Sequence, residues 1–229
     1  MKKIMMMAVA ALMATVNANA QFEAGTFSLQ PMFGIGVSQI TNFDDVSIVV
    51  GSTKLDNQIT AAAMLGVEAE YQLTDKFSAA AGLNYTVQGT GWADYKNGNT
   101  KYNNMRAELG YVKLPIVANY YITKGLAIKA GIQFGFMVSS KFKYSYEDKA
   151  VFFGEERDVD IDYSYDIKKS FETFDLSIPF GLSYQFNSPW VIDARYQLGL
   201  TKLNKVSGEG IKDYKNSVFM ITVGYKFAL

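Results

Sequence analysis

Residues 58–88 read QITAAAMLGVEAEYQLTDKFSAAAGLNYTVQ, and apolar residues occupy every second position through most of this stretch. The apolar positions are odd-numbered up to Leu73 and again from Phe77, while the even-numbered positions between them carry mostly small or polar residues. Alternation with a period of two is typical of a β-strand with one apolar face, and a run of about sixteen residues exceeds an ordinary soluble strand. Residues 74–76 supply a short turn, so the stretch predicts a hairpin of two long antiparallel strands.

The same alternation recurs in six further segments, which brings the expected number of strands to eight. These segments are 27–37, 109–121, 126–138, 174–186, 190–200 and 219–229. In the segment 109–121 the alternation changes phase near Tyr111-Val112, and Pro115 lacks the N–H that a strand ladder requires. We therefore expect a β-bulge or a local ladder defect at Pro115. No helical period is found after the first twenty residues, so the expected fold class is all-β.

The connections between these strands alternate between short and long. Turns at 74–76, 122–125 and 187–189 are tight, whereas the connections at roughly 39–57, 89–105, 143–170 and 202–215 are long. Because they alternate, all long connections share one rim, which is the layout of bacterial outer-membrane barrels with short periplasmic turns. The connection 143–170 holds eight acidic and five basic residues and continues to alternate. It is expected to project from the membrane as a charged ribbon.

The first twenty residues predict a secretory signal peptide rather than a part of the fold. Lys2 and Lys3 give a positive start, residues 4–16 are apolar and uncharged, and Ala18-Asn19-Ala20 has small residues where a signal peptidase reads. The apolar run is too short to span a membrane. Cleavage before Gln21 would leave one domain, 21–229, and an exported chain without an apolar helix can still enter a membrane as a closed barrel.

The composition excludes several classes of function. The chain contains no His and no Cys, which removes imidazole bases, thiol nucleophiles and the usual zinc and haem ligands. Its 22 basic and 22 acidic residues cancel, so it lacks the excess of positive charge that nucleic-acid binding requires. We therefore expect no enzyme activity, no cofactor, no metal site and no nucleic-acid partner.

The residue types on the two strand faces indicate which face meets lipid. The polar face carries Gly, Ala, Ser, Thr, Asn and Gln rather than the Lys and Glu of a solvent face, and small residues fit the crowded lumen of a narrow barrel. A secreted soluble barrel of the lipocalin type would instead turn its apolar face inward. Aromatic residues lie beside the short turns like a membrane girdle: Tyr71, Phe77, Tyr120, Phe186, Trp190 and Phe227. The expected fold is thus an eight-stranded antiparallel up-and-down transmembrane β-barrel.

Several stretches resemble a known family. Residues 110–141 (GYVKLPIVANYYITKGLAIKAGIQFGFMVSSK), 193–203 (DARYQLGLTKL) and 223–229 (VGYKFAL) resemble the porin-like outer-membrane β-barrel domain that is abundant in Bacteroidetes. The resemblance covers essentially the whole chain after the signal peptide. It implies an OmpA/OmpX-like eight-stranded barrel in the outer membrane of a Gram-negative bacterium, and it implies no particular substrate.

The end of the chain resembles the C-terminal signal of outer-membrane barrels. Its pattern is a polar residue at Thr222, glycine at Gly224, and apolar residues at Phe227 and Leu229. By alternation Gly224 faces the lumen, while Phe227 and Leu229 end the row that faces lipid. The expected partners are therefore outer-membrane lipid and the barrel-assembly machinery.

Six charged residues are expected inside the lumen at a similar depth. They are Glu68, Glu70, Lys129, Asp193, Arg195 and Lys226. Three acids and three bases at one level predict an internal ion-pair layer. Such a layer is either a structural plug, which we favour, or a selective constriction. The pair Glu68 and Glu70 could suggest acid–base chemistry, but a closed lumen gives a substrate no access to it.

The function that these features favour is surface interaction or envelope integrity through the outer loops, with an extracellular ligand or surface partner. The alternative is a narrow porin-like diffusion channel for small solutes or ions. The alternating acids Asp158, Asp160 and Asp162 could suggest a calcium loop, but they lack the glycine and the distal glutamate of that motif. A solvated acidic hairpin explains them better.

Overall fold

The computed structural model describes residues 23–43, 55–98, 100–152, 155–205 and 212–229, and within the strands it describes no side chains at 147–152 and 155–160. The predicted signal peptide, residues 1–20, lies outside the described residues, as do the side chains of Asp158 and Asp160. In the described part of the chain, no helix is both long and apolar enough to cross a membrane.

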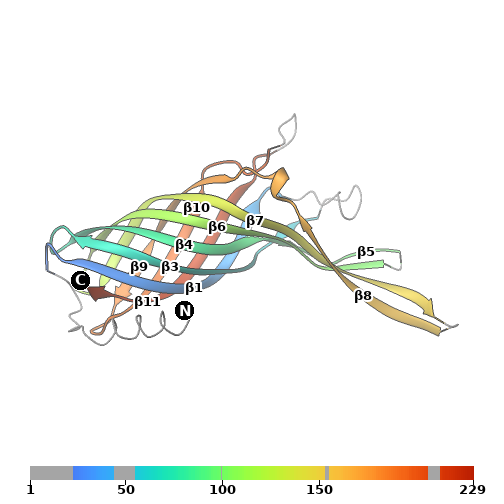
Figure 1. Ribbon diagram of the computed structural model, residues 1–229, viewed down its shortest axis with the longest axis horizontal. Helices are drawn as coiled ribbons and strands as arrows, with labels where there is room; N and C mark the ends of the chain where they lie inside the picture. The colour runs from blue at the N-terminus through green and yellow to red at the C-terminus, as the bar shows by residue number, and fades with distance from the viewer. Residues whose placement is uncertain (1–22, 44–54, 99, 153–154, 206–211) are drawn as a thin grey trace, which may run out of the picture.

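Eight strands form a closed ring (Figure 1). They are β1 (Phe27–Thr41), β3 (Thr60–Gln72), β4 (Phe77–Trp92), β6 (Thr100–Tyr121), β7 (Leu126–Phe152), β9 (Phe174–Gln185), β10 (Trp190–Gly199) and β11 (Lys215–Tyr225). Each strand pairs antiparallel with the next, and β11 pairs with β1 to close the ring. Closure leaves no free edge among these strands, which a lipid environment requires. The predicted eight-stranded antiparallel barrel is confirmed.

Four further strands and one 3₁₀ helix lie outside the ring of eight. They are β2 (Asn57–Gln58), β5 (Tyr95–Asn97), β8 (Glu155–Asp166), β12 (Phe227–Ala228) and η1 (Lys168–Ser170). Strand β8 pairs with the C-terminal part of β7, from Lys141↔Asp166 to Phe152↔Glu155, and β5 pairs with β6. Strands β5 and β8, with the parts of β6 and β7 that pair with them, form a ribbon that projects far beyond the barrel (Figure 1).

The two ends of the barrel differ as the connection lengths predict. We call the end with the short turns between β3 and β4, β6 and β7, and β9 and β10 the turn end, and the opposite end the loop end. The expected ribbon is present, but several strands are longer than predicted, above all β6, which begins at Thr100, and β7, which continues to Phe152. Strand pairing continues past the barrel wall there, since each extended strand still finds a partner.

The outer surface of the ring is apolar, as predicted. Leu65, for example, is 67 % exposed on the outer face, whereas its neighbour Met64 is buried on the lumen side. Aromatic residues gather on the outer face at the turn end, where the Phe77 and Tyr120 rings lie 4.9 Å apart and the Trp190 and Tyr225 rings 5.2 Å apart. The polar side chains point inward, so the arrangement is the reverse of a water-soluble barrel.

Strand β6 has three irregularities, one of which is a register shift with β7 between Asn103 and Arg106. Its register with β4 passes from Ala81↔Ile116 to Asn84↔Lys113, and the pairs between them, which include Pro115, are missing. This is the ladder defect expected at Pro115. The bulge lies elsewhere, because the partner in β7 moves from Ser139 at Gly110 to Met137 at Tyr111.

The bulge changes which side of β7 faces inward. On the turn-end side of the bulge Phe136 faces outward and Met137 inward, whereas on the loop-end side Ser140 and Phe142 are buried. One extra residue reverses the alternation of the strand. Phe142 is thereby turned inward, where it packs against Trp92 instead of facing lipid.

Several glycines are required by the neighbouring strand and not only by the crowded lumen. A Cβ atom on Gly131 would lie 2.0 Å from the Ile116 carbonyl oxygen, and one on Gly181 would lie 2.1 Å from that of Ala194. Real Cβ atoms do not approach a backbone oxygen this closely. Neighbouring strands of this narrow barrel can therefore pack this closely only where the residue has no Cβ atom.

Candidate functional site

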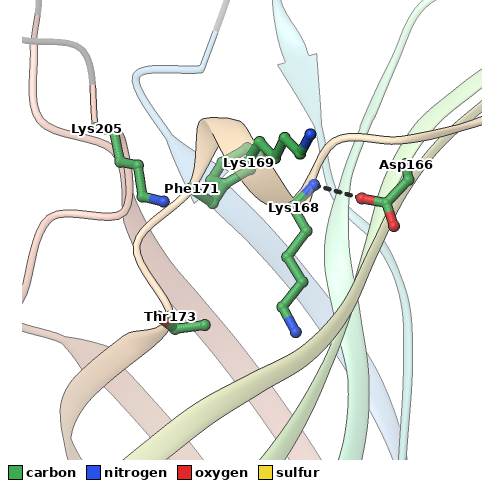
Figure 2. A pocket seen from close by; sticks show the side chains of 6 residues that line it. All are labelled: Asp166, Lys168, Lys169, Phe171, Thr173 and Lys205. Carbon is green, nitrogen blue, oxygen red and sulfur yellow. Dashed lines mark hydrogen bonds between the residues drawn. The ribbon is translucent and has the colours of Figure 1, made fainter.

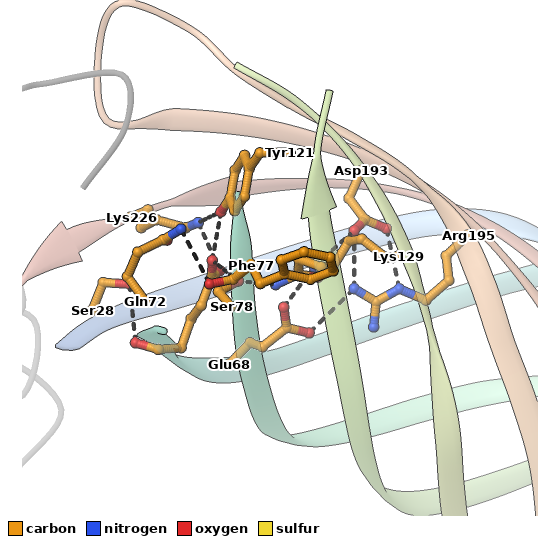
Figure 3. Close-up of polar contacts among 12 residues, drawn as sticks. Ser28, Glu68, Gln72, Phe77, Ser78, Tyr121, Lys129, Asp193, Arg195 and Lys226 are labelled. Carbon is orange, nitrogen blue, oxygen red and sulfur yellow. Dashed lines mark hydrogen bonds and ion pairs between the residues drawn. The ribbon is translucent and has the colours of Figure 1, made fainter. Parts of the chain in front are cut away.

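Four charged residues form a compact cluster inside the lumen (Figure 3). Lys129 Nζ lies 2.6 Å from Glu68 Oε1 and 3.1 Å from Asp193 Oδ2. Arg195 Nη2 lies 3.2 Å from Glu68 Oε2 and 2.9 Å from Asp193 Oδ2. The residues come from β3, β7 and β10, and all four are buried. Two acids thus face two bases, and each acid contacts both bases.

A second cluster lies closer to the turn end. Lys226 Nζ lies 2.7 Å from Glu70 Oε2, and the Ser78 hydroxyl donates to Glu70 Oε1 at 2.6 Å. The Tyr121 hydroxyl also donates to Glu70 Oε1, and Asn119 donates to Ser78 Oγ at 2.8 Å. The six predicted lumen residues therefore all face inward, but they form two adjoining clusters rather than one layer.

A third polar layer, nearer the loop end, surrounds Lys113. Lys113 is 1 % exposed, and its ammonium donates to the side-chain oxygens of Gln88 and Gln197, the latter at 2.6 Å. Gln133 donates to the same Gln197 oxygen and to Ser177, each at 3.0 Å. The alternation of β6 placed Lys113 in the lumen, but the sequence prediction omitted it. Its direct partners are neutral amides, which give no charge pattern to detect.

On the loop-end side of these layers, an apolar cluster closes the barrel. We call it the loop-end cap. It consists of the buried residues Ile40, Leu109, Tyr111, Met137, Phe171 and Leu203. Phe43 packs on it, with its ring 5.7 Å from Phe171 and stacked 4.7 Å from Tyr214. Phe171 and Leu203 belong to connections, which the backbone bond from Glu172 to Leu203 holds together at 2.7 Å. The sequence prediction missed this cap because isolated apolar residues in loops show no period.

The projecting ribbon carries a continuous aromatic face. Tyr144 stacks on Tyr163 at 5.1 Å between ring centroids, and Tyr163 lies 6.1 Å from Tyr165 with nearly parallel rings. Tyr102 on β6 continues the row toward Tyr95 on β5. Burial, a hydrogen bond with Tyr165 and the neighbouring rings raise the pKa of the Tyr144 hydroxyl to about 12. The Tyr144 hydroxyl is therefore a neutral hydrogen-bonding group at physiological pH.

Residues 17–205 match the family model of the outer membrane protein beta-barrel domain. The chain belongs to this family. As an outer membrane β-barrel protein it resides in the outer membrane, in keeping with its apolar outer face. No curated protein matches the chain.

Three solved structures are similar to this outer membrane β-barrel at low identity. Ail, the attachment invasion locus protein of Yersinia pestis, is 14 % identical with a TM-score of 0.45, over 89 % of this chain and 99 % of that one. Neisserial surface protein A is 15 % identical with a TM-score of 0.41, over 88 % and 97 %. OprG from Pseudomonas aeruginosa is 14 % identical with a TM-score of 0.42, over 92 % and 98 %.

The C-terminal residues of the barrel lie at the seam between its first and last strands. Strand β12 pairs with β1 at Ser28 and Leu29, and the Leu229 N–H donates to the Phe27 carbonyl at 2.8 Å. Thr222 and Gly224 face the lumen, and Leu229 is exposed, as predicted. Phe227 departs from the prediction because it is only 4 % exposed and does not end a lipid-facing row.

The strand is interrupted just before Phe227, although its register with β1 does not change. Strand β11 ends at Tyr225, and the Lys226 N–H donates at 2.7 Å to the carbonyl of Pro189, the residue just before the Trp190 that pairs with Tyr225. The prediction assumed one unbroken strand to Leu229. Strand β12 resumes the pairing with β1 at Ser28 and Leu29 in the same register, so it is a separate short segment of the same ladder.

The geometry gives no support to acid–base chemistry at Glu68 and Glu70. Each carboxylate is held by its own cations, and both are buried. Among the described residues, no group of acids is arranged to hold a metal ion. The outer-membrane barrels that form this family are typically non-enzymatic.

Proposed function

We propose that this protein is a closed outer-membrane anchor whose ribbon contacts an extracellular partner. The observation that carries the proposal is the filled lumen: two ion-pair clusters, a glutamine layer around Lys113 and the loop-end cap lie one above another. An eight-stranded barrel has an interior about as wide as its side chains. With so many long side chains bridging it, a solute has no continuous path.

The ribbon supplies the contact surface in this proposal. Its aromatic face, from Tyr95 to Tyr165, is built on paired strands and stands clear of the barrel (Figure 1). Tyrosine is enriched in recognition surfaces because it offers a large, rigid contact area together with a hydroxyl. Short turns face the periplasm in bacterial outer-membrane barrels, which supports placing the loop end outside the cell.

Export and assembly belong to the same proposal. Residues 1–20 would be removed during secretion, and Thr222, Gly224, Phe227 and Leu229 would be recognised by the barrel-assembly machinery. The lumen-facing Gly224 and the exposed Leu229 fit that signal, and the seam position of β12 explains why assembly would await the end of the chain.

A narrow diffusion channel is the second candidate, and one observation favours it. The lumen is polar below the cap, from Lys226 at the turn end to Asp175 near the cap. Displacement of Phe171 and Leu203 would then expose a polar interior to water. In this alternative the ion-pair clusters act as a selective constriction instead of a plug.

Conductance in planar bilayers distinguishes the two candidates. Refolded wild-type protein is expected to show no resolved openings at moderate salt. Arg195→Ala, which vacates volume in the four-residue cluster, is expected to admit ions if that cluster is the barrier. Large, stable wild-type openings that Arg195→Ala leaves unchanged would contradict the anchor and favour the channel.

The role of the ribbon is tested by shortening it. Lys143 and Ser164 are register partners, so residues 144–163 can be replaced by a two-residue Asn-Gly turn. Cells that display this variant should lose adherence to protein-coated and glycan-coated surfaces, while the folded barrel remains in the membrane at normal levels. Unchanged adherence would show that the ribbon is not the contact surface.

A further inference from the structure

A pocket of about 580 Å³ lies at the rim of the loop end (Figure 2). Its lining residues are Asp166, Lys168, Lys169, Phe171, Thr173 and Lys205. The connection between β8 and β9 forms most of it, and Lys205 enters from the connection after β10. Backbone bonds fix these walls, because Lys205 N–H donates to Ser170 O at 3.3 Å and Met137 N–H donates to Thr173 O at 2.7 Å.

The pocket is positively charged, although the surrounding connection is acidic. Three lysines stand against the single carboxylate of Asp166, which already accepts the Lys168 backbone N–H at 2.8 Å. Lys168 Nζ donates to the Val138 carbonyl at 3.2 Å, which uses one of its three N–H groups. In the described part of the chain, neither Lys169 nor Lys205 has a carboxylate partner. The formal charge of the lining is three minus one, or +2.

We propose that this pocket binds a phosphate monoester. Such a group carries a charge of about −1.5 to −2 at neutral pH and three acceptor oxygens, which matches the charge of the lining. In Figure 2 Lys205 lies above Thr173 and Lys168 lies beside it, while Lys169 points away at the upper edge. The Thr173 hydroxyl can donate a further hydrogen bond. A sulfate ester or a carboxylate carries one negative charge and would leave one lysine uncompensated.

The position of the pocket favours a membrane lipid as the source of this phosphate. Lys168 is tied to Val138, which is 46 % exposed on the lipid-facing surface, and Thr173 immediately precedes the lipid-facing Phe174. The pocket thus begins where the apolar belt ends, which is the level of lipid headgroups, and basic pockets there bind phosphorylated headgroups. A soluble sugar phosphate offers the same chemistry. The site lies at the base of the ribbon, and a phosphate site goes beyond the proposed function.

The test uses the whole refolded protein in maltoside micelles, which contain no phosphate. Calorimetry measures the affinity for glucose 6-phosphate and for glucose 6-sulfate, and native mass spectrometry measures retention of phosphatidic acid against phosphatidylcholine. Lys168→Gln/Lys205→Gln removes two of the three cations of the pocket. Lys76→Gln/Lys124→Gln removes the same charge from exposed positions at the turn end and serves as the matched control.

The wild type should bind the phosphate probes in preference to the sulfate and choline probes. The pocket variant should lose about thirtyfold in affinity, and the control should lose less than about threefold. Binding of phosphatidic acid alone would assign the site to a lipid headgroup, and binding of glucose 6-phosphate alone to a soluble ligand; either supports a phosphate site. Equal affinity for the sulfate, equal losses in both variants or no binding by the wild type would overturn it. Heat-modifiable mobility on gels verifies that each variant is folded.

Discussion

Lys129 Nζ and Glu68 Oε1 lie 2.6 Å apart in the barrel lumen, although 61 residues separate them in the chain. Glu68 also forms an ion pair with Arg195, and Asp193 contacts both bases, so each charge is compensated by two partners. A buried ion pair of this kind adds little net stability over apolar packing, but removal of one partner leaves a buried charge uncompensated. The cluster therefore behaves as a unit whose members depend on one another.

Arg195→Ala should destabilise the barrel by about 3–5 kcal/mol, because it leaves Glu68 and Asp193 with only Lys129. The measurement is the urea midpoint of unfolding in detergent micelles. Arg106→Ala is the matched control, since Arg106 pairs with Glu108 at 2.7 Å but is only half-buried. The control should change the unfolding free energy by at most about 1 kcal/mol. Equal losses in the two variants would show that burial of the cluster does not matter.

Leu65→Arg should cost about 2–4 kcal/mol of unfolding free energy, because Leu65 faces the middle of the lipid layer. Leu73→Arg is the control; Leu73 is also exposed but lies at the turn end, where the cost falls to about 0–1 kcal/mol. Both variants are measured by reversible unfolding in phospholipid vesicles. If Leu65→Arg were as mild as Leu73→Arg, the outer face would not be in hydrocarbon.

Gly131→Ala should destabilise the barrel by about 1–3 kcal/mol, because the added methyl group would overlap the Ile116 carbonyl of the adjacent strand. Gly91→Ala is the comparison, since the nearest atom to its added carbon is 3.5 Å away. Thermal unfolding followed by circular dichroism measures both. A neutral Gly131→Ala would mean that β6 and β7 can separate at low cost.

Phe171→Ala should lower stability by about 3–5 kcal/mol through the cavity that it leaves in the loop-end cap. It should not open the lumen, because the Lys113 layer and both ion-pair clusters remain beneath the cap. Phe174→Ala, on the lipid-facing surface, should cost less. Denaturant unfolding and bilayer conductance are measured together, and a conducting Phe171→Ala would show that the cap alone closes the barrel.

Deletion of residues 227–229 should prevent stable insertion, since it removes the β12 pairing with β1 and the Leu229 hydrogen bond at the seam. The truncated chain is expected in the periplasm, degraded or aggregated, and immunoblots of membrane fractions measure it. Ala228→Ser keeps the backbone bonds and should insert normally. Wild-type amounts of the truncated protein in the outer membrane would refute the seam's role in assembly.

Alternation and connection lengths were sufficient to predict the eight strands, the outward apolar face and the projecting ribbon. The physical reason is that both signals are local. A strand with period two has two distinct faces wherever it lies, and a chain that must satisfy every backbone group in lipid has few architectures available. The same parity placed Glu68, Glu70, Lys129, Asp193, Arg195 and Lys226 in the lumen.

The sequence did not show which of those residues contact one another. Only the closed ring determines these contacts. Register and strand stagger set the relative heights of Glu68 on β3 and Asp193 on β10, so six residues expected at one level separate into two clusters. The bulge opposite Gly110 and the break at Lys226 depend on pairing partners that local alternation does not reveal. The loop-end cap and the lysine pocket arise because connections distant in sequence fold over the same barrel mouth. The sequence thus determined the faces of the strands, while contacts between strands and loops required the tertiary structure, because they depend on distances across a closed barrel.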